Sequence, residues 1–311
     1  MTTSPGPEST GEPAPARPLE GRVAVVTGGG KGLGRAFALH LAHLGAAVVV
    51  NNRNREVDAD GRGPADHVVE QIRASGGRAV ADHGDVADPL TSEAVVASAL
   101  ENFGHLDICV TSAAISSPQM LHKTTPENLR GVLAVNVIGT ALVVAAASRV
   151  MREAGHGRIV VVASTAGLHG EPTVSAYAAS KGAVIALART AAVEGARRDV
   201  LCNTLLPYAT TQMTDAGMDP RHAARMTADA VAPVVGALVD PTSTVNGQVI
   251  VTGGGVLRLA QSVELGTVHL PGGDLAPQAL ANLLAESAAG PLHTFTEAQA
   301  AFQNLASEAV S

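Results

Sequence analysis

Residues 158–181 read Arg-Ile-Val-Val-Val-Ala-Ser-Thr-Ala-Gly-Leu-His-Gly-Glu-Pro-Thr-Val-Ser-Ala-Tyr-Ala-Ala-Ser-Lys. The apolar run at 159–163 is typical of a buried strand, and a loop rich in Gly and Pro follows it. An Ala-rich helix then begins behind Ser175, which is a suitable N-cap residue. Tyr177 and Lys181 are four residues apart, so both side chains lie on one face of this helix. The stretch therefore predicts a strand, a loop and a helix that bring a phenol and an ammonium group together.

This pair could carry acid–base chemistry. A free phenol has a pKa near 10, and an ammonium group one turn away would favour the phenolate and lower that pKa. Ser164, at the end of the preceding strand, could place a hydroxyl beside the phenol. The three groups together suit proton transfer to or from an oxygen bonded to carbon. The alternative is that Tyr177 is an ordinary packing residue, because a tyrosine and a lysine at this spacing are common by chance.

The composition narrows the class of protein. The chain has 311 residues, of which 46% are hydrophobic and 16% charged, enough for one large domain or two small ones. Its net charge of −7 and its aromatic content of 2% argue against a nucleic-acid partner. Cys109 and Cys202 lie in apolar runs, so we expect them to pack rather than to form a disulfide or a metal site.

Two segments bear on where the protein resides. Residues 1–20 are rich in Pro, Ser and Glu, and we expect a disordered arm without the features of a signal peptide. The longest apolar run, at 132–147, is interrupted by Asn136 and Gly139 and is shorter than a bilayer requires. We therefore expect this run to form a buried helix in a cytoplasmic protein that binds no membrane.

Strand and helix patterns alternate from Arg22 onward. Strands are predicted at 23–27, 46–51, 78–81, 106–111, 159–163, 200–206 and 248–252, and helices at 33–44, 64–75, 89–103, 126–151 and behind Ser175. The continuous Val and Ile runs indicate strands that are buried on both faces. The alternation predicts an α/β protein with a doubly wound parallel sheet, the Rossmann arrangement.

A glycine-rich turn, Thr27-Gly28-Gly29-Gly30-Lys31-Gly32-Leu33-Gly34, separates the first strand from the first helix. Its glycines have the spacing G-x-x-x-G-x-G. They allow a tight turn and a close approach of the backbone to a pyrophosphate, which would lie on the helix N-terminus. The alternative is a flexible turn without a ligand. The place of the turn between a strand and a helix favours dinucleotide binding.

The residues after the second strand bear on which dinucleotide binds. Dinucleotide-binding folds place a carboxylate there to bind the ribose hydroxyls, whereas this chain has Asn51, Asn52 and Arg53. With Lys31 nearby, Arg53 suits a 2′-phosphate. We therefore expect NADP(H) to be preferred, with NAD(H) possible.

Two further polar residues are candidates. Asp85, which precedes Val86 after the third predicted strand, could accept a hydrogen bond from an adenine amino group or could be a turn residue. Asn136 lies within an apolar helix, where a buried amide needs partners. It therefore either joins packed helices or belongs to a site.

Together these motifs resemble the short-chain dehydrogenase/reductase family over about residues 20–256. The matching residues are Thr27, Gly28, Gly32, Gly34, Asp85, Val86, Asn136, Ser164, Tyr177, Lys181, Asn203 and Pro207. The resemblance implies hydride transfer between a nicotinamide and a carbonyl or alcohol, with Tyr177 as the acid or base and Ser164 orienting the substrate oxygen. It also implies that Lys181 holds the nicotinamide ribose and lowers the pKa of Tyr177. Asn136 would anchor a water molecule in a proton relay.

Within this family the chain is similar to the (3R)-hydroxyacyl-CoA dehydrogenase unit of peroxisomal multifunctional enzyme type 2. The similarity implies a dinucleotide-binding catalytic domain over 21–256 and a C-terminal helical extension over 257–311, with helices near 276–286 and 296–307. It also implies a homodimer or homotetramer. The chain departs from the family pattern at three places that the dinucleotide would contact. These are the loop Thr111, Ser112, Ala113 and Ala114, then Tyr208, which replaces the glycine after Pro207, and Asn52, which stands where the acyl-CoA unit has an acid.

We therefore expect an NADP(H)-dependent oxidoreductase acting on a 3-ketoacyl-CoA-like, 3-hydroxyacyl-CoA-like or polyketide-like substrate. The alternatives are a ketoreductase of secondary metabolism acting on a cyclic or aromatic ketone, and a non-catalytic NADP(H)-binding sensor or scaffold. A methyltransferase also has a glycine-rich turn but would not use Tyr177 and Lys181. His169, and Thr210 and Met213 in the loop at 207–219, are candidate substrate contacts.

Overall fold

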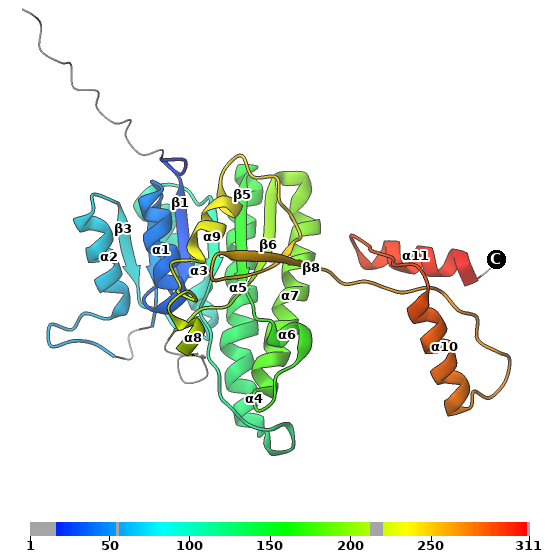
Figure 1. Ribbon diagram of the computed structural model, residues 1–311. Helices are drawn as coiled ribbons and strands as arrows, with labels where there is room; N and C mark the ends of the chain where they lie inside the picture. The colour runs from blue at the N-terminus through cyan, green and yellow to red at the C-terminus, as the bar shows by residue number, and fades with distance from the viewer. Residues whose placement is uncertain (1–16, 54–55, 212–219, 310–311) are drawn as a thin grey trace, which may run out of the picture.

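A parallel sheet between two layers of helices forms the centre of the protein (Figure 1). The computed structural model describes residues 17–53, 56–211 and 220–309, and within these ranges the sheet has eight strands in the order β3-β2-β1-β4-β5-β6-β7-β8. They are β1 (Val23–Thr27), β2 (Ala47–Asn51), β3 (Ala79–Asp82), β4 (Ile108–Thr111), β5 (Gly157–Val162), β6 (Val200–Pro207), β7 (Val249–Gly253) and β8 (Val256–Ala260). Strands β1 to β7 pair in parallel, so the predicted doubly wound fold is confirmed.

Helices cover both faces of the sheet because the side chains of each strand point alternately to the two sides. On one face lie α1 (Gly32–His43), α2 (Pro64–Ala74) and α9 (Ala232–Val239), and on the other α3 (Pro89–Phe103), α5 (Thr140–Ala154) and α7 (Ser175–Gly195). Along β1, Ala24 and Val26 enter the first core, whereas Val23 and Val25 enter the second. Cys109 and Cys202 are buried and free. Three further described α-helices before β7 are short: α4 (Pro126–Leu133), α6 (Ala166–His169) and α8 (Pro220–Ala223).

The helical stretch from α4 to α5 is longer than predicted. It runs over Pro126–Ala154 and includes a π-helical segment, Ala134–Gly139, between the two α-helices. The stretch has 29 residues, and the mean hydropathy of its most apolar 18-residue window is 2.0, so it is long and apolar enough to cross a membrane by length and composition, a test that a buried core helix also passes. Half of its most apolar window is buried inside the protein, where α5 packs on α3, α7 and the sheet.

The C-terminal extension stands apart from the sheet in Figure 1. It contains α10 (Pro277–Ala289) and α11 (Ala298–Ala309), close to the two helices expected there. The predicted extension at 257–311 also includes most of β8, which pairs antiparallel with β7, so the sheet reaches Ala260. Large apolar side chains are exposed along the extension, including Leu280, Leu284, Phe302 and Leu305. Much of the apolar surface of this segment therefore remains open to solvent in the single chain.

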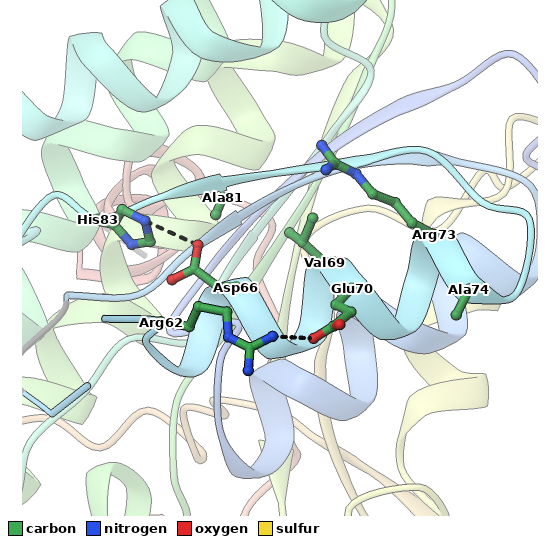
Figure 2. Close-up of a pocket in the computed structure, with 8 residues that line it drawn as sticks. All are labelled: Arg62, Asp66, Val69, Glu70, Arg73, Ala74, Ala81 and His83. Carbon is green, nitrogen blue, oxygen red and sulfur yellow. Dashed lines mark hydrogen bonds and ion pairs between the residues drawn. The ribbon is translucent and has the colours of Figure 1, made fainter. Parts of the chain in front are cut away.

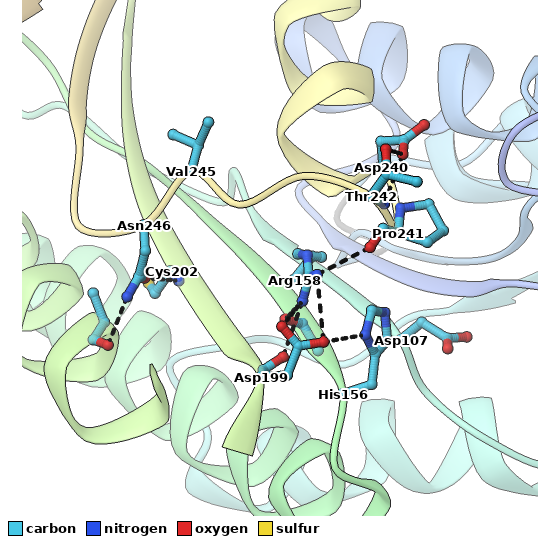
Figure 3. Close-up of polar contacts among 12 residues, drawn as sticks. Asp107, His156, Arg158, Asp199, Cys202, Asp240, Pro241, Thr242, Val245 and Asn246 are labelled. Carbon is cyan, nitrogen blue, oxygen red and sulfur yellow. Dashed lines mark hydrogen bonds and ion pairs between the residues drawn. The ribbon is translucent and has the colours of Figure 1, made fainter. Parts of the chain in front are cut away.

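A buried arginine fastens the end of the sheet opposite the carboxyl ends of the strands (Figure 3). Arg158, on β5, is 3% exposed, and its guanidinium donates to the carbonyl oxygens of Asp199 at 2.9 Å and Pro241 at 3.1 Å. The Asp199 carboxylate lies 3.2 Å from the same guanidinium, and Nδ1 of His156 lies 2.9 Å from that carboxylate. Burial opposes ionisation of Asp199, but the bonds from His156 and Arg158 hold its pKa below the usual value. The cluster ties β5 to the turn before β6 and to the loop after α9.

Replacing Arg158 with Met should lower the free energy of unfolding by about 3 kcal/mol, because buried carbonyl groups would lose a charged donor. Arg149 provides a matched control: its guanidinium lies 2.7 Å from Glu93, but both side chains are exposed. Arg149→Met should lower the stability by less than about 1 kcal/mol. Urea denaturation followed by circular dichroism measures both variants. Equal losses would contradict the fastening role of Arg158.

Candidate active site

A groove of about 1020 Å³ lies at the carboxyl ends of the parallel strands, where the strand order reverses around β1 and β4. Most of the predicted site residues line it: Gly28, Lys31, Gly32, Leu33, Gly34, Asn52, Arg53, Asp85, Val86, Ser112, Ala113, Ala114, Ser164, Tyr177, Lys181, Pro207 and Tyr208. Among the described residues, Gly30, Asn136, His169 and Thr210 are not part of its lining. Met213 lies outside the described residues.

The turn after β1 can pack closely against its own backbone neighbours because its glycines have no side chains. Gly28 has a φ of 65°, and a Cβ atom there would lie 2.7 Å from the amide nitrogen of Ala113. A Cβ atom on Gly34 would overlap the carbonyl group of Gly28. Helix α1 begins at Gly32 without a side-chain cap, so its first amide groups can bind an anion. This cradle fits the pyrophosphate of a dinucleotide.

Three predicted contacts lie away from the groove lining. A Cβ atom on Gly30 would lie 2.7 Å from the Cβ of Pro64, so this glycine lets the turn pack against α2. His169 is exposed at the end of α6. The amide of Thr210 donates to the carbonyl of Met226 at 2.6 Å. Gly30 therefore supports the turn by packing, and His169 and Thr210 do not line the groove.

Both cations predicted for the adenosine end are already in ion pairs. Nζ of Lys31 lies 2.6 Å from the Glu56 carboxylate, and Arg53 lies 3.1 Å from the Asp85 carboxylate. The hydrogen bond from Lys31 holds the pKa of the Glu56 carboxyl below its usual value. Glu56 also lines the groove, and sequence reasoning missed it. A 2′-phosphate at this place would therefore have to compete with two carboxylates for its cations.

The three candidate catalytic side chains meet in the groove. Ser164 follows β5, while Tyr177 and Lys181 lie on α7. Lys181 is 4% exposed, and its Nζ donates to the carbonyl oxygen of Val162 at 2.8 Å. The same nitrogen lies 5.5 Å from the centre of the Tyr177 ring. The helical spacing of four residues therefore brings the ammonium group beside the phenol, as predicted.

The direction of the Tyr177 pKa shift differs from the prediction. Burial raises the pKa of Tyr177, and the hydrogen bond with Ser164 lowers it by less. Burial also lowers the pKa of Lys181 to about 8. The net shift is therefore opposite to the one expected from Lys181, because desolvation is the larger effect. At neutral pH Tyr177 holds its proton, which suits a general acid.

Asn136 connects the groove wall to the helix that carries Tyr177. This side chain is 1% exposed and lies in the π-helical segment. Its Oδ1 accepts from the amide of Ile115 at 2.8 Å, and its Nδ2 donates to the Ile115 carbonyl at 2.9 Å and to Oγ of Ser180 at 3.0 Å. Ser180 in turn donates to the carbonyl of Tyr177 at 2.6 Å. Asn136 therefore positions the site through its neighbours.

The end of the groove beside Ser164 contains polar residues that sequence reasoning missed. Thr165, Glu171 and Thr173 line it. Thr173 has a φ of 68°, which is unusual for a β-branched residue. Oγ1 of Thr165 lies 2.9 Å from the hydroxyl of Tyr208. In the sequence, only the position of Thr165 next to Ser164 could have drawn attention to these residues.

A second, smaller pocket of about 680 Å³ lies against α2 and the edge strand β3 (Figure 2). Its charged side chains pair with one another: Arg62 lies 3.3 Å from Glu70, and His83 lies 3.2 Å from Asp66. Arg73 donates from Nε to the carbonyl of Ala79 at 2.9 Å. The described lining of this pocket includes none of the candidate site residues. The chemistry is therefore assigned to the larger groove.

The chain is similar to known proteins over most of its length. Residues 22–223 match a family model described as short chain dehydrogenase. The chain is 41% identical over 242 residues to a short-chain type dehydrogenase/reductase from Mycobacterium tuberculosis, covering 77% of this chain and 85% of that protein. It is 38% identical over 238 residues to the peroxisomal multifunctional enzyme type 2 of Drosophila melanogaster, covering 76% of this chain but 39% of that longer protein. Versicolorin reductase 1 of Aspergillus parasiticus is 40% identical over 192 residues, covering 61% of this chain and 70% of that protein.

The fold also matches that of a solved structure. The crystal structure of a short chain dehydrogenase from Mycobacterium avium has a TM-score of 0.77 and 32% sequence identity, covering 89% of this chain and 98% of that chain. Identity at this level over nearly the whole of the solved chain supports a shared family as well as a shared fold.

The buried ammonium of Lys181 should leave a measurable pH dependence of stability. Its pKa is about 8 in the folded protein and about 10.4 when unfolded, so between these values the unfolded chain binds more protons. The contribution of Lys181 to stability therefore rises with pH through this window, by about 3 kcal/mol. In Lys181→Met this rise should be lost. Urea titrations at pH 7 to 10.5 give the free energy of unfolding of both proteins. The difference between wild type and variant isolates the contribution of Lys181, because the other titrating groups cancel. A constant difference would rule out a buried charge.

Proposed function

Because the chain belongs to the short-chain dehydrogenase/reductase family, we propose that it is an NADP(H)-dependent ketoreductase acting on a 3-ketoacyl-like or polyketide-like substrate. One observation carries the proposal: Ser164, Tyr177 and Lys181 line the same groove as the glycine cradle of α1. The similarity to multifunctional enzyme type 2 supports an acyl substrate.

The three side chains divide the proton chemistry between them. A bound nicotinamide would supply or accept the hydride. Tyr177, kept protonated by burial, donates its proton to the carbonyl oxygen during reduction. Ser164 hydrogen-bonds the same oxygen and orients it. The nearby ammonium of Lys181 favours the phenolate that remains after the proton has left. In oxidation of an alcohol, the same phenolate accepts the proton.

Tyr177→Phe should lower kcat by about 10²- to 10⁴-fold, because the substrate oxygen would lose its proton donor. Binding of NADPH should be nearly unchanged, since the proposed role of the phenol is toward the substrate. The assay is oxidation of NADPH with acetoacetyl-CoA, longer 3-ketoacyl-CoA thioesters and a set of cyclic and aromatic ketones. Near-normal turnover by the variant would overturn the role of Tyr177. NADPH binding without turnover of any ketone by the wild type would favour the sensor or scaffold.

The preference for NADP(H) rests on the residues after β2. Asn52 stands where a ribose-binding carboxylate would select NAD(H), and Lys31 and Arg53 both line the groove. The carboxylates of Glu56 and Asp85 offset these cations. Since Glu56 is exposed, its side chain can turn away and release Lys31 to a phosphate.

We expect NADPH to bind about tenfold more tightly than NADH, the range of one charge-assisted hydrogen bond after competition with the carboxylates. Arg53→Ala should remove most of this difference, whereas Glu56→Gln should enlarge it by freeing Lys31. Arg62→Ala is a matched control, because Arg62 is ion-paired outside the groove and should leave the ratio unchanged. Fluorescence titration with both dinucleotides gives the ratio. Tighter binding of NADH by the wild type would refute the preference.

A ketoreductase of secondary metabolism acting on a cyclic or aromatic ketone is the second candidate. The similarity to versicolorin reductase 1 and the charges of the groove both favour it. Among the described lining residues, Lys31 and Arg53 lie at the adenosine end, whereas the end beside Ser164 holds Glu171, hydroxyl groups and Lys181, whose buried ammonium donates to the Val162 carbonyl. The phosphates of a CoA ester would favour cations there. Activity on cyclic ketones without activity on CoA thioesters would select this candidate.

We also propose that the protein is a homo-oligomer. Apolar side chains are exposed on the domain, for example Ile138 and Val193, and along α10 and α11 in the extension. Burial of such surface against a second copy would remove it from water. The extension is suited to this role because it stands apart from its own sheet (Figure 1). Light scattering at micromolar concentration decides between monomer, dimer and tetramer.

A further inference from the structure

Two hydroxyl groups face each other beside the candidate catalytic serine. Tyr208 follows β6 and Thr165 follows Ser164, so the hydrogen bond of 2.9 Å between them joins the ends of β5 and β6. Both residues line the groove. The amide of Tyr208 is fixed by the carbonyl of Thr252 at 2.8 Å, and a Cβ atom on Gly253 would lie 2.8 Å from the Cβ of Tyr208. The position of Tyr208 is therefore fixed both at its backbone and at its hydroxyl group.

The pair retains one free donor. A hydroxyl group has one proton and can accept two hydrogen bonds, so two hydroxyls joined by one bond keep one proton between them, whichever of them donates. Tyr208 is 48% exposed, and an exposed hydrogen bond between neutral groups adds little to stability. The pair is thus accessible in the groove, and its hydrogen bond contributes little to the stability of the fold.

We propose that Tyr208 and Thr165 bind a second oxygen of the substrate, on the β carbon of the ketone, two bonds from the reacting carbonyl carbon, as in a 1,3-dioxygenated ketone. This inference rests on the proposed function, in which Ser164 binds the reacting oxygen. Consecutive Cα atoms are about 3.8 Å apart, so donors at Ser164 and at the neighbouring hydroxyl pair can serve two oxygens of one small molecule. The shared chemistry fits both a 3-ketoacyl thioester and an aromatic ketone with a hydroxyl group on the adjacent ring position.

Two matched pairs of substrates test the proposal. The first is the N-acetylcysteamine thioester of acetoacetate against that of 4-oxopentanoate, in which the two carbonyl groups are one carbon further apart. The second is 8-hydroxy-1-tetralone against 1-tetralone, which lacks the second oxygen. For each pair, kcat/KM for the first substrate is divided by kcat/KM for the second. This ratio is measured in the wild type, Tyr208→Phe, Thr165→Val and Thr165→Ser, together with the affinity for NADPH.

In Tyr208→Phe the ratio should fall about three- to tenfold, the range of one neutral hydrogen bond, with the change mainly in KM. Thr165→Val should act in the same direction because it removes the partner of the phenol, and Thr165→Ser should restore the ratio. The substrate pair whose ratio falls shows whether the second oxygen is that of a thioester carbonyl or that of an aromatic hydroxyl group.

Two other results separate the possible failures. If both members of each pair lose kcat/KM equally, or if the loss follows NADPH affinity, Tyr208 acts on the dinucleotide and the inference is wrong while the proposed function stands. If the wild type reduces none of the four ketones, the proposed function fails and the inference fails with it.

Discussion

The geometry of the candidate active site depends on the buried amide of Asn136. Its hydrogen bonds reach Ile115, in the loop after β4, and Ser180, on the helix that carries Tyr177. The loop and the helix both contribute residues to the groove, so one side chain sets the distance between its two walls. Because the amide is buried, its loss would leave donors and acceptors without water to replace it. The π-helical segment is the local structure that holds this amide in position.

Removal of water from the site disfavours the charged forms of both Tyr177 and Lys181. The phenol of Tyr177 is less acidic than a free phenol, and the ammonium of Lys181 is a stronger acid than a free one, because in each case the charged form is disfavoured. Sequence spacing shows that the two groups are neighbours. It does not show how much solvent surrounds them, and this decides which effect is larger.

Features that depend on local backbone requirements could be predicted from the sequence. The glycine turn is recognisable because a Cβ atom at Gly28 or Gly34 would meet the backbone, and the parallel sheet because its strands are continuous apolar runs. The pairing of Lys31 with Glu56 could not be predicted, since it depends on how two loops approach each other. Strand β8 was missed because its side chains are largely exposed and therefore give no pattern of burial. The contact of Thr165 with Tyr208 joins residues from two different strand ends and has no local signal.

Strand β8 also changes what the sheet presents to other molecules. Without it, β7 would be the last strand, and its backbone N–H and C=O groups would be open along Val249–Gly253. Such a row of unpaired groups is a template onto which any extended chain can add. By turning back through Gly254 and Gly255, both at positive φ, the chain covers this row with its own next five residues. The short antiparallel strand thus pairs the outer side of β7 and moves the edge of the sheet to the five residues of β8.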